Sequence, residues 1–178
     1  MLRAWLIRIF ACILIAAMVP STARAQSADE LATLNRQVVQ LHGQGKYAEA
    51  CALAEQVLAA SERIFDPEHP NTLASVNNLA GLYNALGRYG EAEPLFKRAL
   101  AAYERGLGPE HPSTLTSVNN LAVLYNAQGR YGEAEPLLKR ALAARERVHG
   151  SEHPDTLGSV NNLAVLYEAQ GLSNGSQC

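Results

Sequence analysis

The chain has 178 residues, 48% of them hydrophobic, and a formal net charge of −2. This length suits one domain or a short array of repeats. The charge argues against nucleic acid as a partner, because phosphate neutralisation requires a basic surface. Residues 1–25 hold three of the 15 basic residues and none of the 17 acidic ones, so the rest of the chain carries −5.

The N-terminal segment has the pattern of a secretory signal. Arg3 and Arg8 precede an apolar run over 9–19, and Ala23 and Ala25 then form an Ala-x-Ala cleavage pattern. The run is shorter than the roughly 20 residues of a membrane-spanning helix. We expect residues 1–25 to be a cleaved bacterial-type signal peptide, which makes the mature protein secreted or periplasmic, with no membrane contact after cleavage. An uncleaved N-terminal anchor is the alternative.

A repeat of 42 residues dominates the rest of the chain. Glu-His-Pro recurs at 68–70, 110–112 and 152–154, and residues 67–104 match 109–146 at 32 of 38 positions. A diverged copy precedes them, because Leu31, Asn35 and Tyr47 stand 42 residues before Leu73, Asn77 and Tyr89. Residues 26–170 are therefore three full units and the first half of a fourth, followed by a polar tail at 171–178. The six differing pairs are Asn71/Ser113, Ala74/Thr116, Gly81/Val123, Leu86/Gln128, Phe96/Leu138 and Tyr103/Arg145.

Each unit is predicted to form two helices. The apolar residues of its first half and of its second half both follow the helical period. The residue after the proline, at 71, 113 or 155, can cap the first helix, and Gly87 and Gly129 are suited to end it. The first-helix stripe is Leu73, Val76, Leu79, Ala80 and Tyr83. We expect seven helices, at about 29–43, 46–64, 71–86, 88–106, 113–128, 130–148 and 155–170.

The run from Val76 to Ala80, with Tyr83, Gly87, Tyr89 and Ala92, resembles the tetratricopeptide repeat. The 42-residue period, the Glu-His-Pro link and the Glu-Ala-Glu-Pro-Leu segment at 91–95 are similar to the kinesin light chain subgroup. The resemblance implies an all-α fold, a right-handed solenoid of stacked antiparallel helix pairs. It also implies that the first helices line a concave groove that binds a protein or an extended peptide.

Asparagines are the candidate binding residues of that groove. One column offset from the apolar stripe should point outward, and an amide side chain both donates and accepts hydrogen bonds, so it can hold a peptide backbone. The adjacent Asn78, Asn120 and Asn162 we interpret as structural. The predicted groove is nearly neutral, so a preference for acidic ligands is not expected. The groove candidates are Asn35, Asn77, Asn84, Asn119, Asn126 and Asn161.

The three Glu-His-Pro histidines, His69, His111 and His153, do not predict a metal site. Zinc ligands lie about 2 Å from the ion, whereas packed helices are about 8–10 Å apart. Linker packing is the better interpretation. The histidines and acids of the units recur as part of the repeat, and no nucleophile motif or phosphate-binding loop is present. We expect no enzyme activity, no metal and no cofactor.

The last predicted helix, 155–170, keeps the apolar pattern of an interior helix but lacks a second helix to cover it. Solenoid ends normally need a polar cap, and exposed apolar patches often mark interfaces. We therefore expect an exposed patch around Leu163 and Tyr167 that could support a homo-oligomer. Two further interpretations stay open beside groove binding: a structural subunit that assembles through its ends, and a regulatory remnant of a larger protein.

Overall fold

The computed structural model describes the backbone of residues 21–175 and the side chains of residues 28–171. Seven helices fill this part of the chain, as the sequence predicts. The first helices of the four units are α2 (Ser21–Gly43), α4 (Pro70–Ala85), α6 (Pro112–Ala127) and α8 (Pro154–Gly175). The second helices are α3 (Tyr47–Ile64), α5 (Tyr89–Leu107) and α7 (Tyr131–His149).

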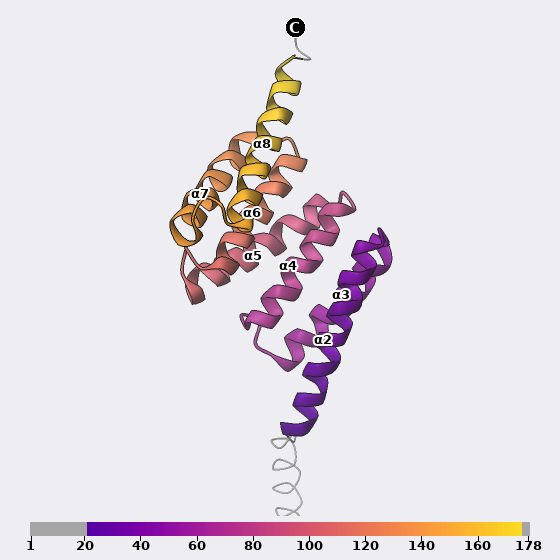
Figure 1. Cartoon of the computed structure of the whole chain (residues 1–178). Helices are drawn as coiled ribbons and strands as arrows, with labels where there is room; N and C mark the ends of the chain where they lie inside the picture. The colour runs from indigo at the N-terminus through magenta and orange to yellow at the C-terminus, as the bar shows by residue number, and fades with distance from the viewer. Residues whose placement is uncertain (1–20, 176–178) are drawn as a thin grey trace, which may run out of the picture.

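The helices form an extended stack of hairpins with the two ends of the array far apart (Figure 1). Each helix packs on the next in chain order, and α6 also contacts both α4 and α8. Among the described residues no two second helices pack comparably. The first helices therefore lie closer together than the second helices do, and they form the inner side of the curve.

The starts of the first helices differ from prediction. The capping residue is the histidine of Glu-His-Pro, not the residue after the proline. His69 Nδ1 accepts from the backbone N–H of Asn71 at 3.1 Å, and His111 Nδ1 accepts from that of Ser113 at 3.2 Å. Because proline lacks an N–H and fixes φ near the helical value, it suits the first helical position directly after a cap. The repeated histidines thus have a structural role.

The ends of α4 and α6 follow prediction. Gly87 and Gly129 have φ of 70° and 73°, a left-handed conformation that glycine adopts without strain. In α4, the N–H groups of Gly87 and Arg88 bond back to the carbonyls of Asn84 and Tyr83. These bonds satisfy carbonyls that the helix itself leaves free and turn the chain sharply into α5.

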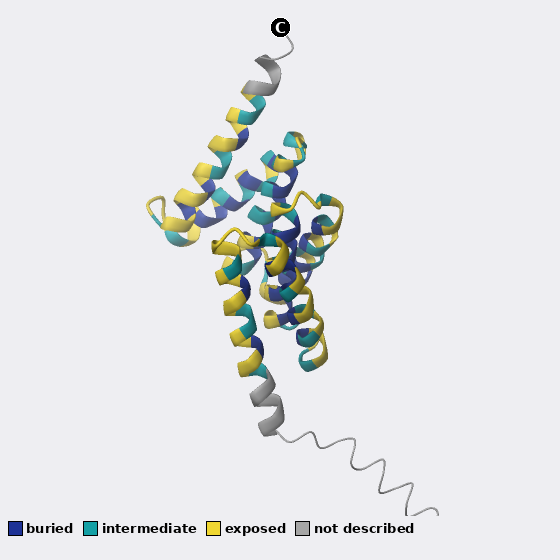
Figure 2. Cartoon of the chain, turned by 90° about the vertical axis from the view of Figure 1, so that its right-hand side faces the viewer, coloured by how far each residue is buried: buried dark blue, intermediate teal, exposed yellow. Residues whose placement is uncertain are grey.

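The core lies between the helix layers, and burial follows the predicted stripe (Figure 2). In α4 the whole stripe is buried, from Leu73 at 2% exposure to Tyr83 at 8%. Facing it, α5 contributes alanines and two large side chains, Phe96 and Tyr103. Small residues on one helix against large ones on the other allow close packing of the two helices.

The patch predicted on the last helix is displaced from where we expected it. Leu163 is half-buried and packs against the core, so its inclusion in the exposed patch was wrong, whereas Tyr167 is 44% exposed. The other exposed apolar side chains of α8 include Leu157 and Val160. The helical stripe has two sides: one packs against α7, through buried Leu166, and only the other is open.

Parts of the N- and C-terminal predictions cannot be placed in this fold. Residues 1–20 of the predicted signal and 176–178 of the tail lie outside the described residues. The helices α2 and α8 run beyond their predicted limits, to Ser21 and Gly175 respectively. Among the described helices, none has the length and apolar character needed to cross a membrane.

Candidate binding surface

A hollow lies on the inner side of the solenoid and spans three first helices. The residues around it come mainly from α2, α4 and α6, with one contribution from α5. We call it the central hollow. It is lined by Val38, Val39, His42, Asn77, Asn78, Gly81, Leu82, Asn84, Phe96, Asn120 and Val123.

Two further hollows continue the same surface. The α2–α4 hollow includes Leu31, Asn35, Ser61, Asn71, Ala74 and Asn78. The α4–α6 hollow includes Ala74, Asn77, Asn78, Tyr103, Ser113, Thr116 and Asn120. Shared residues connect all three, because Asn78 lines each of them. We refer to the three hollows together as the groove.

The predicted column through Asn77 lies at the junction between units. Asn77 Nδ2 donates to Ser117 Oγ at 3.0 Å, from α4 to α6. One unit on, Asn119 Oδ1 accepts from Asn162 Nδ2 at 2.9 Å, from α6 to α8. Both residues are half-buried, and Asn77 lines two of the hollows. These amides hold first helices together at the edge of the groove.

The adjacent column faces the groove more openly than the sequence analysis expected. Asn78 is exposed and lines all three hollows, and half-buried Asn120 lines two. Only Asn162 of this column, through its bond to Asn119, has the interhelical contact expected of a structural residue. The 3.6-residue helical period separates neighbouring residues by about 100°. The apolar stripe alone does not decide which of two adjacent asparagines points inward.

The other predicted asparagines are spread along the array. Asn35 lines the α2–α4 hollow and Asn84 the central hollow. Asn126 is half-buried at the position of Asn84 in the next unit, and Asn161 is exposed on α8. The Oδ1 atoms of Asn77, Asn84 and Asn126 are buried without a hydrogen-bond donor.

Differences between the two near-identical units concentrate in the groove. Of the 38 aligned positions, ten line a hollow in at least one unit, and five of these ten differ. Among the other 28 positions only Leu86/Gln128 differs. Three of these five pairs, Asn71/Ser113, Ala74/Thr116 and Gly81/Val123, lie on the accessible inner surface, whereas Phe96/Leu138 and Tyr103/Arg145 are buried beneath it.

The groove is apolar and amide-rich. Its lining side chains include no lysine, arginine, aspartate or glutamate, and His42 is the one titratable group of the central hollow. The described ion pairs lie instead among the second helices and the connections between units. This surface suits a ligand that offers a polar backbone and apolar side chains.

Comparison with known proteins agrees with this architecture. The family model of the tetratricopeptide repeat matches residues 29–105, 72–147 and 114–174, which together cover most of the chain. The chain belongs to the tetratricopeptide repeat family. Proteins of this family are generally non-catalytic scaffolds for interactions between proteins. The comparison with curated proteins found no match.

Solved tetratricopeptide structures include similar arrays. A putative kinesin light chain of Podosopora anserina with nearly identical TPR-like repeats is 37% identical, with a TM-score of 0.74 over 80% of this chain and 67% of that one. A variant of that protein is 34% identical, with a TM-score of 0.67 over 88% of this chain and 78% of that one. BtubC (BKLC) from P. vanneervenii is 25% identical, with a TM-score of 0.70 over 79% of this chain and 56% of that one.

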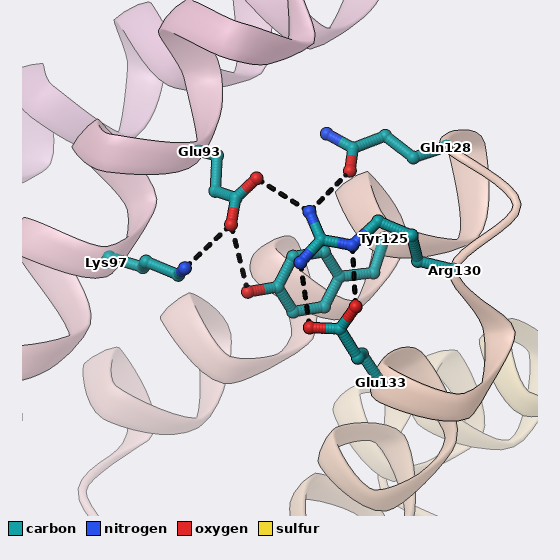
Figure 3. Close-up of polar contacts among 6 residues, drawn as sticks. All are labelled: Glu93, Lys97, Tyr125, Gln128, Arg130 and Glu133. Carbon is teal, nitrogen blue, oxygen red and sulfur yellow. Dashed lines mark hydrogen bonds and ion pairs between the residues drawn. The ribbon is translucent and has the colours of Figure 1, made fainter.

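A polar network joins the second and third tetratricopeptide units (Figure 3). Glu93 of α5 accepts from Lys97 at 2.6 Å and from Arg130 at 2.7 Å, and the Tyr125 hydroxyl of α6 lies at 3.4 Å. The Arg130 guanidinium lies over the Tyr125 ring at 4.1 Å and also binds Glu133 of α7. One carboxylate thus connects three successive helices.

The contact between the first and second units has a different version of this network. Cys51 stands at the position of Glu93, and Glu55 at that of Lys97. The Tyr83 hydroxyl donates to Glu55 at 2.8 Å, and Arg88 lies over the Tyr83 ring at 4.2 Å. Burial and the Glu55 carboxylate raise the pKa of Tyr83 to about 12. Cys51 is buried and free. It leaves Arg88 without the carboxylate that Glu93 gives to Arg130 in the next unit.

Stability should depend on pH through Glu93. Hydrogen bonds from Lys97 and Arg130 lower the pKa of Glu93 to about 2, from an ordinary value of 4.5. A lowered folded-state pKa contributes stability that is present above the unfolded pKa and lost as pH falls toward the folded one. Glu93→Gln should lower the free energy of unfolding by about 1 kcal/mol at pH 7, since Glu93 is partly exposed, and by little at pH 2.5.

Urea denaturation at pH 7, 4 and 2.5 measures this difference. Glu62→Gln is the matched control, because Glu62 pairs with Arg98 in a more exposed bridge at 2.7 Å. Such bridges contribute about 0–1 kcal/mol, so this control should change little at any pH. An equal loss for Glu93→Gln at pH 7 and pH 2.5 would show that the carboxylate charge does not stabilise the junction.

No described group of three or more histidine, cysteine or acidic side chains has the arrangement of a metal site. His69 and His111 use their Nδ1 atoms as helix caps, and His153 does the same toward the N–H of Asp155 at 3.2 Å. His69 also stacks on Phe65, with ring centroids 4.4 Å apart. These contacts account for the repeated histidines through packing.

Proposed function

We propose that this tetratricopeptide chain is a non-catalytic scaffold that binds an extended peptide, or an extended segment of a partner protein, in the groove on its inner face. The observation that carries the proposal is the placement of internal variation: five of the six differences between near-identical units fall on groove-lining positions. A purely structural inner face would give no reason for the variation to gather there.

The chemistry of the groove supports a peptide ligand. Asn78 and Asn120 present amides that can donate to and accept from a peptide backbone. Val39, Val123 and Phe96 provide apolar surface between these amides. A backbone clamp with apolar side-chain sites favours a neutral, extended segment over a strongly charged one.

A peptide-display selection against the purified chain tests the proposal. The variant Asn78→Ala with Asn120→Ala should fail to retain the enriched peptides, with affinity reduced by roughly tenfold or more, because each lost pair of backbone bonds costs about 1–3 kcal/mol. The variant Asn77→Ala with Asn119→Ala should also lose binding, and in addition stability, because these residues bond across units. Enrichment of peptides that both variants retain would contradict groove binding.

Self-association through α8 is the second candidate, because apolar side chains on that helix are open. Light scattering over a wide concentration range tests it, and a strict monomer at high concentration would exclude it. Secretion or export to the periplasm is part of the same proposal and rests on the sequence pattern of residues 1–25. Protease protection of the chain in intact cells, before and after release of the periplasm, would test that location.

A further inference from the structure

One buried position of the second helices carries a different residue in each unit. It holds Ser61 in α3, Tyr103 in α5 and Arg145 in α7, each 42 residues from the next. All three are buried, at 1%, 6% and 8% exposure. Ser61 lines the α2–α4 hollow and Tyr103 the α4–α6 hollow, so their side chains lie beneath the inner surface where two units meet. We call positions 61, 103 and 145 the floor position.

The surroundings of the floor position are repeated while the residue itself changes. The next first helix contributes a buried serine each time, Ser75, Ser117 or Ser159. Ser61 Oγ lies 3.2 Å from Ser75 Oγ, and Arg145 Nη1 donates to Ser159 Oγ at 2.8 Å. The group beneath the inner surface is therefore a small hydroxyl at the first contact between units, a phenol at the second and a guanidinium at the third.

The charge of Arg145 has no acidic partner within ion-pair distance among the described residues, whereas Arg140 and Arg147 of the same helix each bind a glutamate. Besides the serine hydroxyl, Arg145 binds the Asp155 carbonyl at 3.0 Å and Thr116 Oγ1 at 3.4 Å. These bonds use three of the five guanidinium N–H groups and leave two for a ligand.

Burial makes this cation a good partner for an anion. It lowers the pKa of Arg145, although the charge of Asp155 acts in the opposite direction. The Asp155 carboxylate itself lies 3.9 Å from His153 Nδ1. Because Coulomb attraction is stronger away from bulk water, an anion that reached the two remaining donors would be bound more firmly than at an exposed arginine.

The inner surface over Arg145 carries the same kinds of residue as the groove. Thr116 and Gly158 are exposed there, and Asn120 and Asn162 are half-buried. Glycine stands at 158 where the preceding unit has Thr116, and an added Cβ at this glycine would meet no atom within 4 Å. A peptide backbone held by the two amides could thus direct a short acidic group toward the guanidinium.

We propose that the floor position selects the ligand group that lies over each contact between units, and that Arg145 selects a carboxylate. This inference rests on the proposed groove binding and specifies its ligand: an extended, mainly neutral segment with one carboxylate over α6 and α8. The carboxylate belongs to an aspartate, a glutamate or the C-terminus of the segment. A guanidinium can bind it through two parallel N–H bonds, which Ser61 and Tyr103 cannot offer.

Exchanging the floor residues between two units tests the proposal. Arg145→Tyr with Thr116→Ala gives the third contact the two residues that stand at the second, Tyr103 and Ala74. Peptides that the wild-type chain enriches in a display selection should share one acidic residue or a free C-terminus at a fixed place. The variant should enrich peptides without this feature. Circular dichroism shows whether the variant is folded.

The reverse exchange is the matched variant and keeps the test decisive if the first one unfolds. Tyr103→Arg with Ala74→Thr places a second guanidinium at the contact between α4 and α6, where Ser117 again offers a hydroxyl. Selected peptides should then gain a second acidic position roughly three residues from the first. Neighbouring helices are about 8–10 Å apart, and an extended chain rises about 3.3 Å per residue.

Titration of one selected peptide and its neutral analogues measures the effect. The wild-type chain should bind the amide analogue of the acidic residue, or the C-terminally amidated peptide, about tenfold more weakly, and whichever change weakens binding identifies the source of the carboxylate. The variant Arg145→Tyr with Thr116→Ala should bind acidic and neutral peptides equally. Equal binding of both by the wild-type chain would overturn this inference.

The outcome also separates this inference from groove binding itself. Peptides that depend on Asn78 and Asn120 but share no carboxylate, or keep it after the Arg145 exchange, would overturn the inference and leave groove binding intact. Absence of enriched peptides, or peptides that the asparagine variants retain, would overturn both.

Discussion

Leu115→Ala is expected to lower the free energy of unfolding by about 2–5 kcal/mol, whereas Leu157→Ala is expected to cost less than about 1 kcal/mol. The two leucines occupy the same repeat position, 42 residues apart. Leu115 is fully buried between α6 and α7, and Leu157 is 54% exposed on α8. Truncation leaves a cavity at Leu115 and only removes partly hydrated surface at Leu157.

Urea denaturation followed by circular dichroism measures both changes. The comparison controls for residue type and for helix propensity, because both substitutions are leucine to alanine in a first helix. Equal losses of about 3 kcal/mol would show that another part of the protein covers α8 in solution.

Gly81→Leu is expected to stabilise the chain and at the same time to remove ligand binding. Gly81 lies inside α4, where an added Cβ would meet no neighbouring atom within 4 Å, and its φ is not positive. Replacing a helical glycine by leucine contributes about 0.5–1 kcal/mol. Val123 already occupies this position in α6. The new side chain would fill the central hollow, and affinity for a groove ligand should fall by tenfold or more.

Thermal unfolding and peptide titration of the same variant separate the two effects. Gly90→Ala is the control, because Gly90 is exposed near the start of α5, has room for a Cβ and lies outside the groove. It should leave binding unchanged. Peptide affinity that survives Gly81→Leu would place the ligand elsewhere on the molecule.

The repeat made most of the fold predictable. The register of Glu-His-Pro and the apolar stripe located all seven described helices within a few residues, apart from the longer outer ends of α2 and α8. The turns at Gly87 and Gly129 were also predictable, because glycine adopts a left-handed conformation without strain. The helix caps did not, because His69 accepts through Nδ1 in a role more often filled by serine, threonine or aspartate.

The site was less predictable, for a geometric reason. Helical periodicity identifies a buried side of a helix but not which neighbour buries each part of it. Leu163 and Leu157 belong to one stripe, yet the first packs against the core and nothing described covers the second. The same limit applies to Asn77 and Asn78, which differ by about 100° around α4. Contacts between units, such as that of Asn77 with Ser117, determine which of the two asparagines faces the groove. These contacts cannot be read from the spacing of residues in the sequence.

The most direct test of groove binding is chemical-shift mapping on the isotope-labelled chain with a display-selected peptide. We predict that the perturbed resonances cluster on α2, α4 and α6, including the side-chain amides of Asn78 and Asn120. Perturbations concentrated on the outer surfaces of α3, α5 and α7, or on Leu157, Val160 and Tyr167 of α8, would contradict the account.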